Sequence, residues 1–338
     1  MAHHAEKSEK SGHEIIPVTL LTGFLGAGKT TLLNDILAQA GGHRFGVIEN
    51  EFGDLGIDSA LVEAPVEEVF ALNEGCLCCT VRNDLVELFE RLADQGSAFD
   101  HILIEASGLA DPGPVMKVFE LPQIRSNFRL EGVVTVVDAQ QIERDLLETP
   151  TCAEQITYAD LLVLNKVENL GEARLTEIES RLAQLNPLAQ RARSPEARFP
   201  VETILQLGRD DLGLETRRSN PASAEESPHR HDDSIGSVAV EAPGDIDVDE
   251  LDVWLGSLVR RHDMKLLRMK GVVAIPGMDR RFVFHGVRDV VDVVPGPPWQ
   301  DEIRCNRAVF IGRGLDAEML RTGFLACVQS PSRVRSHP

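Results

Sequence analysis

Three cysteines within four positions are the residues of this chain best suited to hold a metal. Cys76, Cys78 and Cys79 occur in the stretch Gly-Cys-Leu-Cys-Cys, and closely spaced thiolates bind soft metal ions such as zinc. A closed zinc site needs four ligands, so two or three thiolates leave a position for water, a carboxylate or a second protein. Glu49 and Glu51 are candidate extra ligands from an upstream loop. The incomplete set indicates a site that passes its metal on, with Zn²⁺ favoured and Co²⁺ or Cu⁺ as alternatives.

Two other interpretations of the motif stay open, a redox pair and inert buried thiols. We expect the remaining cysteines, which are isolated in sequence, to be ordinary buried thiols; they are Cys152, Cys305 and Cys327. Histidines near the N-terminus and at positions 229 and 231 give a weaker metal signal, and a solvated tail and a solvated linker explain them better.

A glycine-rich segment has the pattern of a phosphate-binding loop. Gly-Phe-Leu-Gly-Ala-Gly-Lys-Thr occupies residues 23–30, between the predicted strand and the predicted helix that this motif requires. Backbone N–H groups of such a loop surround phosphate oxygens at the N-terminus of the helix. We expect Lys29 to reach the β- and γ-phosphates and the Thr30 hydroxyl to ligate Mg²⁺.

A buried strand that ends in an acid is predicted downstream. Ile-Leu-Ile at 102–104 precedes Glu105, and a carboxylate there can hold Mg²⁺ through water or orient the attacking water. The alternative is a glutamate that only ends the strand. Residues 108–114 are rich in glycine and proline, as expected of a loop that senses the γ-phosphate. We predict Lys29 and Glu105 as catalytic residues, and Thr30 and Glu105 as magnesium ligands.

A third motif indicates guanine as the base. Asn165-Lys166-Val167-Glu168 follows a predicted strand and resembles the Asn-Lys-x-Asp motif of GTPases. A carboxylate accepts hydrogen bonds from the guanine ring N–H and exocyclic amine, which adenine does not offer in that arrangement. Because Glu replaces Asp at Glu168, the backbone or rotamer must absorb one methylene.

Apolar periodicity predicts alternating strands and helices from residue 14 to about residue 210. The predicted strands cover residues 15–21, 44–48, 101–104, 132–137 and 161–164, and the predicted helices cover residues 30–40, 83–93 and 172–185. Such alternation implies a mainly parallel sheet with helices on both faces. Ligands bind these sheets at the carboxyl ends of the strands, where the motifs fall. The predicted fold class is α/β, a phosphate-loop NTPase.

A second, smaller α+β domain is predicted towards the C-terminus. Its strands are expected at 235–240, 266–275, 281–294 and 308–312, and its helices at 248–261 and 316–328. The domain division is a disordered tail at 1–13, a phosphate-loop GTPase domain with the cysteine motif at 14–215, a linker at 216–234, the C-terminal domain at 235–330 and a tail at 331–338. A length of 338 residues is typical of about two domains.

The charge balance limits the partners. A formal net charge of -20 argues against nonspecific binding to nucleic acid or an anionic membrane, and no apolar run approaches the roughly 20 residues of a membrane-spanning helix. The polar N-terminal segment lacks a hydrophobic signal core, so we expect a cytoplasmic protein. Its expected partners are GTP and an unidentified client metalloprotein, and a homodimer is left open.

The motifs in order resemble the CobW-type metallochaperone GTPases, in particular the YjiA-like members. The matching segments are TGFLGAGKTTLLN, ENEFGD, GCLCC, EASGLADPGPV, NKVE, LRMKG and VFIG. The similarity extends from about residue 15 to residue 328. It implies slow GTP hydrolysis with Mg²⁺, zinc at the Cys-x-Cys-Cys motif, and delivery of that metal to a client.

The resemblance also assigns site residues by position. It implies a nucleotide site made of Gly23, Gly26, Ala27, Gly28, Lys29, Thr30, Thr31, Asn165, Lys166 and Glu168. It implies a metal site made of Cys76, Cys78 and Cys79, with Glu49 as a partner. The linker has only two histidines where many relatives have long histidine tracts, which argues against bulk metal storage.

Three hypotheses follow from these observations. The first is a GTPase whose nucleotide state controls metal affinity at the thiolates. The second is a zinc-buffering or regulatory protein in which GTP is only a structural ligand. The third is a kinase that uses the same phosphate loop, against which the guanine-type motif argues.

Overall fold

The computed structural model describes residues 15–49, 68–71, 80–94, 99–207 and 235–328. The predicted linker and both predicted tails lie outside these residues, as do Glu51 and the cysteines at 76, 78 and 79.

Of the predicted buried thiols, Cys152 and Cys327 are buried, whereas Cys305 is partly exposed. The prediction for Cys305 was wrong because it is the first residue of a strand, where its Sγ is 3.1 Å from the Glu241 carboxylate.

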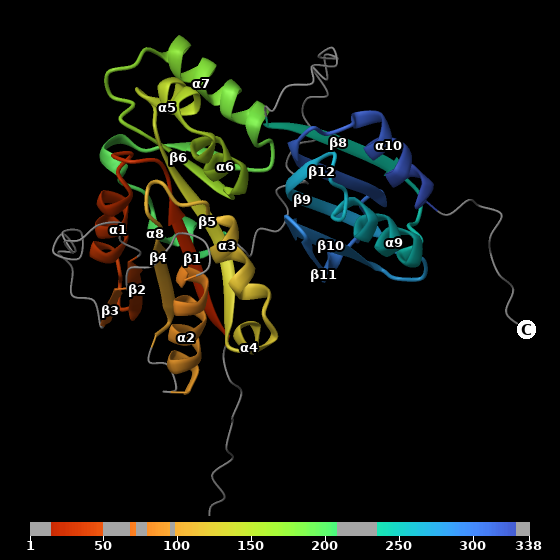
Figure 1. The fold of residues 1–338 in the computed structure, drawn as a ribbon, viewed down its shortest axis with the longest axis horizontal. Coiled ribbons are helices and arrows are strands. Elements are labelled where there is room, and N and C mark those ends of the chain that lie inside the picture. The colour runs from red at the N-terminus through yellow and green to blue at the C-terminus, as the bar shows by residue number, and fades with distance from the viewer. Residues whose placement is uncertain (1–14, 50–67, 72–79, 95–98, 208–234, 329–338) are drawn as a thin grey trace, which may run out of the picture.

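A parallel sheet forms the centre of the N-terminal domain, as predicted (Figure 1). Its order is β3-β2-β4-β1-β5-β6-β7. The strands are β1 (Ile16–Thr22), β2 (Phe45–Glu49), β3 (Glu68–Ala71), β4 (His101–Glu105), β5 (Phe128–Asp138), β6 (Leu161–Asn165) and β7 (Gln190–Arg193). Buried side chains cover both faces of β1, because Val18 belongs to one apolar cluster and Leu21 to the other. This burial on both faces explains its continuous apolar sequence.

Helices cover both faces of this sheet. The N-terminal domain contains α1 (Lys29–Ala38), α2 (Thr80–Asp94), α3 (Gly113–Met116), α4 (Pro122–Arg125), α5 (Ile142–Glu148), α6 (Pro150–Tyr158), α7 (Glu172–Leu185) and α8 (Val201–Leu205), with 3-10 turns η2 (Lys117–Glu120) and η3 (Pro195–Ala197). Helix α1 buries Leu32, Leu33 and Ile36 in one cluster, whereas α2 buries Leu85 and Phe89 in the other. Their apolar residues recur at helical spacing, which explains why both were predicted.

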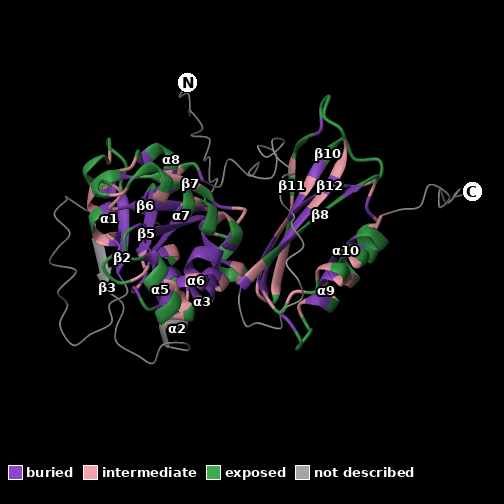
Figure 2. Ribbon diagram, turned by 90° about the horizontal axis from the view of Figure 1, so that it is seen from above, coloured by how far each residue is buried: buried purple, intermediate pink, exposed green. Residues whose placement is uncertain are grey.

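The C-terminal domain is an antiparallel sheet with helices on one face, the smaller α+β unit that was expected. Its order is β11-β10-β9-β12-β8. The elements are β8 (Ile235–Pro243), α9 (Val248–Leu258), β9 (Lys265–Ala274), β10 (Arg280–Val287), β11 (Val290–Pro298), β12 (Cys305–Arg313) and α10 (Ala317–Ala326). Figure 2 shows α9 and α10 on one face of the sheet and the N-terminal domain on the other.

The strand predicted over residues 281–294 is two strands, so that prediction was wrong. Strands β10 and β11 form an antiparallel hairpin in which Val287 pairs with Val290. Arg288 adopts a left-handed backbone conformation, with φ of 56°, which reverses the chain. The sequence hides this turn, because Arg-Asp occupies it where glycine or asparagine usually marks a two-residue hairpin loop.

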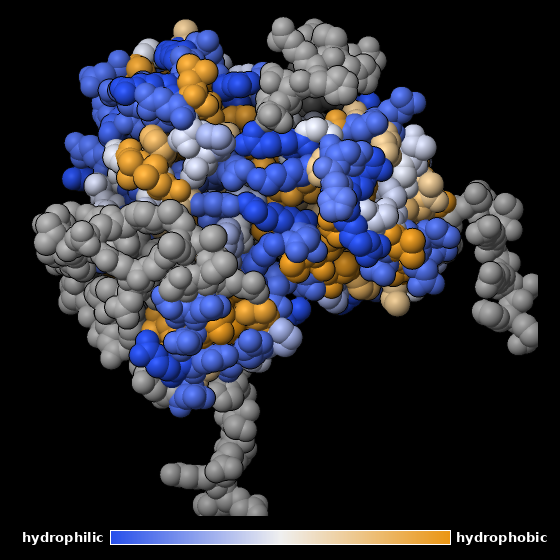
Figure 3. Space-filling view, in the orientation of Figure 1, coloured by the Kyte–Doolittle hydropathy of each residue, from blue (hydrophilic) through white to orange (hydrophobic). Residues whose placement is uncertain are grey.

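The surface is largely polar. Charged and polar side chains dominate the face seen in Figure 3, with apolar side chains in smaller groups. Across the described ranges, no helix is long and apolar enough to cross a membrane.

Candidate functional site

The phosphate loop joins β1 to α1 with a backbone that only glycine accommodates at two positions. Gly23 has φ of 139° and Gly28 has φ of 109°, where L side chains are strained. A Cβ on Gly23 would overlap the carbonyl oxygen of Val136, and a Cβ on Gly28 would overlap the Asn165 amide. The loop therefore fits closely against the strands that follow it in the sheet.

The lysine of the loop has a buried position. Lys29 begins α1 and is 9% exposed, and its Nζ is 3.5 Å from the Phe24 carbonyl oxygen across the loop. This places the cation beside the first turn of α1, where unpaired N–H groups also favour an anion. Ala27 is buried within the loop, whereas Gly26 and Thr31 are exposed.

The structure brings the two predicted magnesium ligands together. Glu105 ends β4, and its Oε1 accepts a hydrogen bond from the Thr30 hydroxyl at 2.9 Å. Glu49 ends β2 and lies beside Glu105 in the parallel register. Glu49 is only 3% exposed. A hydroxyl and carboxylates at one sheet edge are hard oxygen donors, the type that Mg²⁺ prefers, so these residues fit that ion.

The guanine-type motif lies against the phosphate loop. Asn165 ends β6, and its Nδ2 donates to the Ala27 carbonyl at 2.8 Å. Lys166 has φ of 58°. Its Nζ donates to the Gly26 carbonyl at 2.9 Å and pairs with the Asp138 carboxylate at 2.7 Å. The two motifs, far apart in sequence, are thus joined by direct hydrogen bonds.

A loop that was not predicted completes this end of the site. The turn η3 follows β7, and Glu196 and Ala197 both have left-handed backbone conformations. The Glu196 N–H donates to Glu168 Oε1 at 2.8 Å, and the Ala197 N–H donates to Asn165 Oδ1 at 2.9 Å. The signal that could have found it is its position after another parallel strand, at the same edge of the sheet.

Asp138 is a second residue that the sequence did not single out. It ends β5, is 7% exposed and pairs in register with Asn165. One carboxylate oxygen accepts from the backbone N–H of Gln140 at 2.9 Å, while the other binds the Lys166 ammonium. Asp138 therefore holds the lysine of the motif against the phosphate loop.

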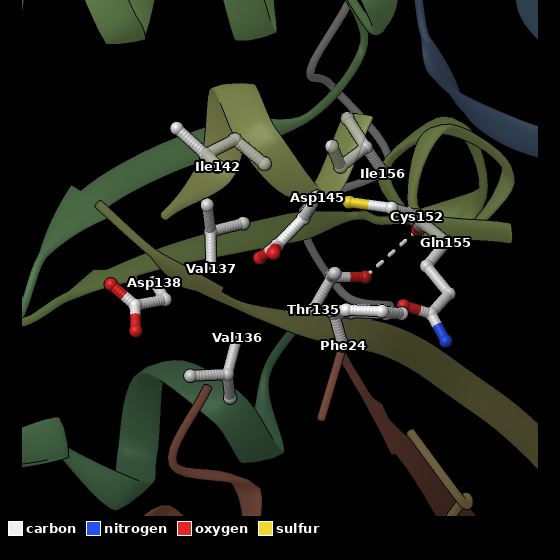
Figure 4. Close-up of a pocket in the computed structure, with 10 residues that line it drawn as sticks. All are labelled: Phe24, Thr135, Val136, Val137, Asp138, Ile142, Asp145, Cys152, Gln155 and Ile156. Carbon is white, nitrogen blue, oxygen red and sulfur yellow. Dashed lines mark hydrogen bonds between the residues drawn. The ribbon is translucent and has the colours of Figure 1, made fainter. Parts of the chain in front are cut away.

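A small pocket lies beside the phosphate loop, and Phe24 is one of the residues that line it (Figure 4). The space in it that a water-sized sphere can occupy is about 10 Å³, which is room for about one water molecule and too small for a ligand. The Asp145 carboxylate and the Cys152 thiol line it, and Thr135 donates to the Gln155 carbonyl at 3.0 Å. Burial, with a smaller effect of Asp145, raises the pKa of Cys152 to about 12. This thiol is therefore neutral and a poor metal ligand.

The cysteine motif falls between two described elements. Strand β3 ends at Ala71, which pairs in register with Glu49, and α2 begins at Thr80. The motif thus follows, within a few residues, a strand end at the edge of the sheet that also carries Glu49 and Glu105. Within the described ranges, no group of three or more His, Cys, Asp or Glu side chains forms a metal site.

Comparison with known proteins gives consistent matches over most of the chain. Residues 17–193 match the family model for the CobW/HypB/UreG nucleotide-binding domain, and residues 235–328 match that for the cobalamin synthesis protein CobW C-terminal domain. The zinc chaperone YjiA of Escherichia coli is 35% identical over 91% of this chain and 98% of its own length. The zinc chaperone CobW of Pseudomonas aeruginosa is also 35% identical, over 91% of each chain.

A solved structure agrees with these matches. The crystal structure of Zn(II)-bound YjiA GTPase from E. coli is 29% identical, with a TM-score of 0.71 over 94% of this chain and 100% of that chain. Both domains are included in that coverage. The chain belongs to the CobW family, with a CobW/HypB/UreG nucleotide-binding domain followed by a CobW C-terminal domain.

Proposed function

We propose that the protein is a GTP-hydrolysing metallochaperone that binds zinc at the Cys-x-Cys-Cys motif and delivers it to a client protein. The observation that carries the proposal is the convergence of the phosphate loop, Glu105 and Asn165-Lys166 at one sheet edge, with the cysteine motif following a strand at that edge. The relatives named zinc chaperones, and the Zn(II)-bound YjiA GTPase, support the same function.

Nucleotide binding is assigned to the two hydrogen-bonded motifs. The loop glycines and Ala27 would present backbone N–H groups to the phosphates, beside Lys29, Thr30 and Thr31 on α1. Asn165 and Lys166 would fix the base side of the loop. The exposed Glu168 carboxylate would accept the guanine N–H groups, held by the hydrogen bond from Glu196.

Phosphate transfer to water is assigned to Lys29 and Glu105. Mg²⁺, which Thr30 and Glu105 would hold, supplies neutralisation of the charge on the phosphates. Lys29 would stabilise negative charge on the β- and γ-phosphate oxygens from its buried position. Glu105 would also orient the attacking water, because its carboxylate lies at the mouth of the loop next to Thr30.

Zinc is the cargo in this proposal, with Co²⁺ as an alternative. Cys76, Cys78 and Cys79 would bind it as thiolates, and Glu49 would complete the set when the metal is held. Glu49 lies beside Glu105 in the strand register. A change in position of the magnesium ligand Glu105 would therefore act directly on the zinc ligand Glu49.

The remaining partner assignments are predictions. The client is an unidentified metalloprotein, a homodimer stays open, and the formal net charge of -20 disfavours nucleic acid and anionic membranes. A cytoplasmic location is proposed because reduced thiols persist in that compartment.

Zinc affinity in three nucleotide states tests the proposal. We expect Zn²⁺ to bind about tenfold differently with a non-hydrolysable GTP analogue than with GDP or without nucleotide, a coupling of about 1.4 kcal/mol. Cys78→Ser should abolish tight binding, whereas the control Cys305→Ser, on a strand of the other domain, should not. Equal affinities in all states would contradict coupling, and no phosphate release from GTP would favour the zinc-buffering alternative.

A further inference from the structure

The loop that follows Glu105, residues 106–112, touches the phosphate loop directly. A Cβ placed on Gly108 would lie 2.8 Å from the backbone nitrogen of Leu25 and 2.9 Å from its Cα. Such distances leave no room for a side chain between the two loops. Any movement of the phosphate loop at Leu25 must therefore be accommodated by the 106–112 loop, and the reverse is also true.

Helix α6 supports the 106–112 loop from beneath. The Gln155 amide, on a side chain that is 1% exposed, donates to the Gly108 carbonyl at 3.0 Å and to the Ala110 carbonyl at 3.1 Å. One side chain thus satisfies two buried carbonyl groups of the loop, which fixes its path over the helix.

The C-terminal domain reaches the same loop through the β10–β11 hairpin. Arg288, at the turn of this hairpin, donates from Nε to the Tyr158 hydroxyl at 2.9 Å and forms an ion pair with Asp111. A Cβ on Gly113 would lie 2.9 Å from Arg288 Nε and 3.0 Å from the Tyr158 hydroxyl oxygen. The guanidinium is therefore closely enclosed where the 106–112 loop enters α3.

Helix α6 also binds the C-terminal domain next to Gln155. Glu154 is 9% exposed. It lies 3.1 Å from Lys265, 3.7 Å from Arg313 and 3.9 Å from Arg288, measured between charged nitrogen and carboxylate oxygen. All three cations belong to the C-terminal domain. Consecutive residues of α6 therefore contact the 106–112 loop and the opposite domain.

We propose that Arg288 is a positioning residue for GTP turnover, which acts from the C-terminal domain by holding the 106–112 loop through Asp111. This inference rests on the proposed GTP hydrolysis and adds a residue outside the nucleotide-binding domain to it. The path runs from Leu25 of the phosphate loop through Gly108 and Asp111 to Arg288. A client or metal that shifts the hairpin would thereby change the position of the loop behind Glu105.

We expect loss of the contact between Arg288 and Asp111 to lower kcat for GTP hydrolysis. GTP is held by the phosphate loop and the Asn165-Lys166 motif, which Arg288 does not touch, so the KM for GTP should change less than twofold. The 106–112 loop is continuous with Glu105, the residue assigned to orient water, so loss of its restraint should lower kcat. Misplacement of about 1 Å at a reacting centre costs tenfold or more.

A double-mutant cycle between the two domains tests the inference. We expect Arg288→Ala and Asp111→Asn each to lower kcat about tenfold, and the double variant to be no slower than Arg288→Ala, since both changes remove one contact. Asp111→Asn keeps an oxygen for the Gly113 N–H, which the wild-type Asp111 carboxylate accepts at 2.9 Å. Because each variant breaks the contact from a different domain, one remains informative if the other folds poorly.

Arg125→Ala is the matched control. It removes another ion pair between the domains, Arg125 to Asp292 at 3.4 Å, without touching the 106–112 loop, and should leave kcat within twofold of wild type. Two results would overturn this inference alone, provided that the wild type hydrolyses GTP. One is a kcat of Arg288→Ala equal to that of Arg125→Ala. The other is a double variant in which the losses in kcat of the two single variants multiply. A wild type that releases no phosphate would overturn the proposed turnover, and the inference with it.

Discussion

Asn165 is the side chain that joins the parts of the nucleotide site. It is 5% exposed, donates to the Ala27 carbonyl of the phosphate loop and accepts from the N–H groups of Lys166 and Ala197. A buried amide with donors and acceptors on three segments cannot be shortened without leaving polar groups unpaired. Its role is therefore to hold the loops in register before any base contact is made.

Asn165→Ala should separate binding from folding when it is compared with a second asparagine. We expect it to lower the free energy of unfolding by roughly 2–3 kcal/mol, because buried partners lose their hydrogen bonds, and to weaken GTP binding at least tenfold. Asn186 is a suitable control, since it is 0% exposed and its amide donates to the carbonyls of Ile156, Thr157 and Ala159.

Urea unfolding and nucleotide titration measure the two quantities. Asn186→Ala should lose similar stability while GTP affinity stays within twofold of wild type. An equal loss of affinity in both variants would show that Asn165 acts only through stability.

His101 makes the stability of the N-terminal domain depend on pH. It lies at the start of β4, is 3% exposed and shares a hydrogen bond of 2.9 Å with the Thr19 hydroxyl. Burial, with a smaller contribution from the charge of His43, lowers the pKa of His101 to about 4. The unfolded chain takes up this proton near pH 6.5, so the contribution is complete above that pH and is lost as pH falls towards 4.

The loss at pH 5 should be about 2 kcal/mol for this one proton. Unfolding at pH 7.5 and pH 5.0 measures it, and His101→Gln should reduce the difference between the two pH values by that amount. His43→Gln, at an exposed neighbour, should keep most of the difference. An unchanged pH difference in His101→Gln would refute the assignment.

At the scale of elements, the sequence predicts helices and strands whose apolar residues recur at a regular spacing. It misses elements that bury polar and apolar residues together. The strands ending at Glu105 and Asn165, and helices α1 and α7, follow period and motif, and the structure confirms them. Helix α6 has no apolar stripe, because it is buried on several sides and includes the polar Glu154 and Gln155. Hydrogen bonds from Gln155 to the 106–112 loop, and ion pairs of Glu154 with the opposite domain, keep these two polar side chains inside.

The candidate site shows the same division. The phosphate loop, Glu105 and the Asn165-Lys166 motif could be predicted, since each is a contiguous pattern with a known chemical role. Asp138 and Ala197 could not, because they contribute through position alone: each lies at the carboxyl edge of the sheet, next to Lys166 or Asn165. Such residues become visible only when strand order is known.

At the scale of the molecule, the domains share a hydrophobic core and a partly buried ion pair. The largest apolar cluster includes C-terminal residues Ile235, Leu267, Val272, Val283 and Ile311 together with residues of the N-terminal domain.

Arg268, on β9, donates to the Tyr158 and Ala159 carbonyls and pairs with Asp160, and its side chain is only 8% exposed. Burial opposes the charge on Asp160, but Arg268 and Lys270 hold its pKa below the usual range. The contacts between the two domains are thus part of the folded structure.

Removal of Arg268 should therefore uncouple the two domains. The Arg268 side chain is buried and that of Asp160 is 27% exposed, so loss of Arg268 should cost less than the roughly 3–5 kcal/mol of a fully buried pair. Calorimetry of Arg268→Ala should show two unfolding transitions where the wild type shows one. Arg125→Ala removes an exposed pair worth at most about 1 kcal/mol and should keep one transition. If Arg268→Ala also unfolds in one transition at an unchanged temperature, this ion pair does not couple the domains. A structural change at the nucleotide site would then have to reach a client by a route that does not include the C-terminal sheet.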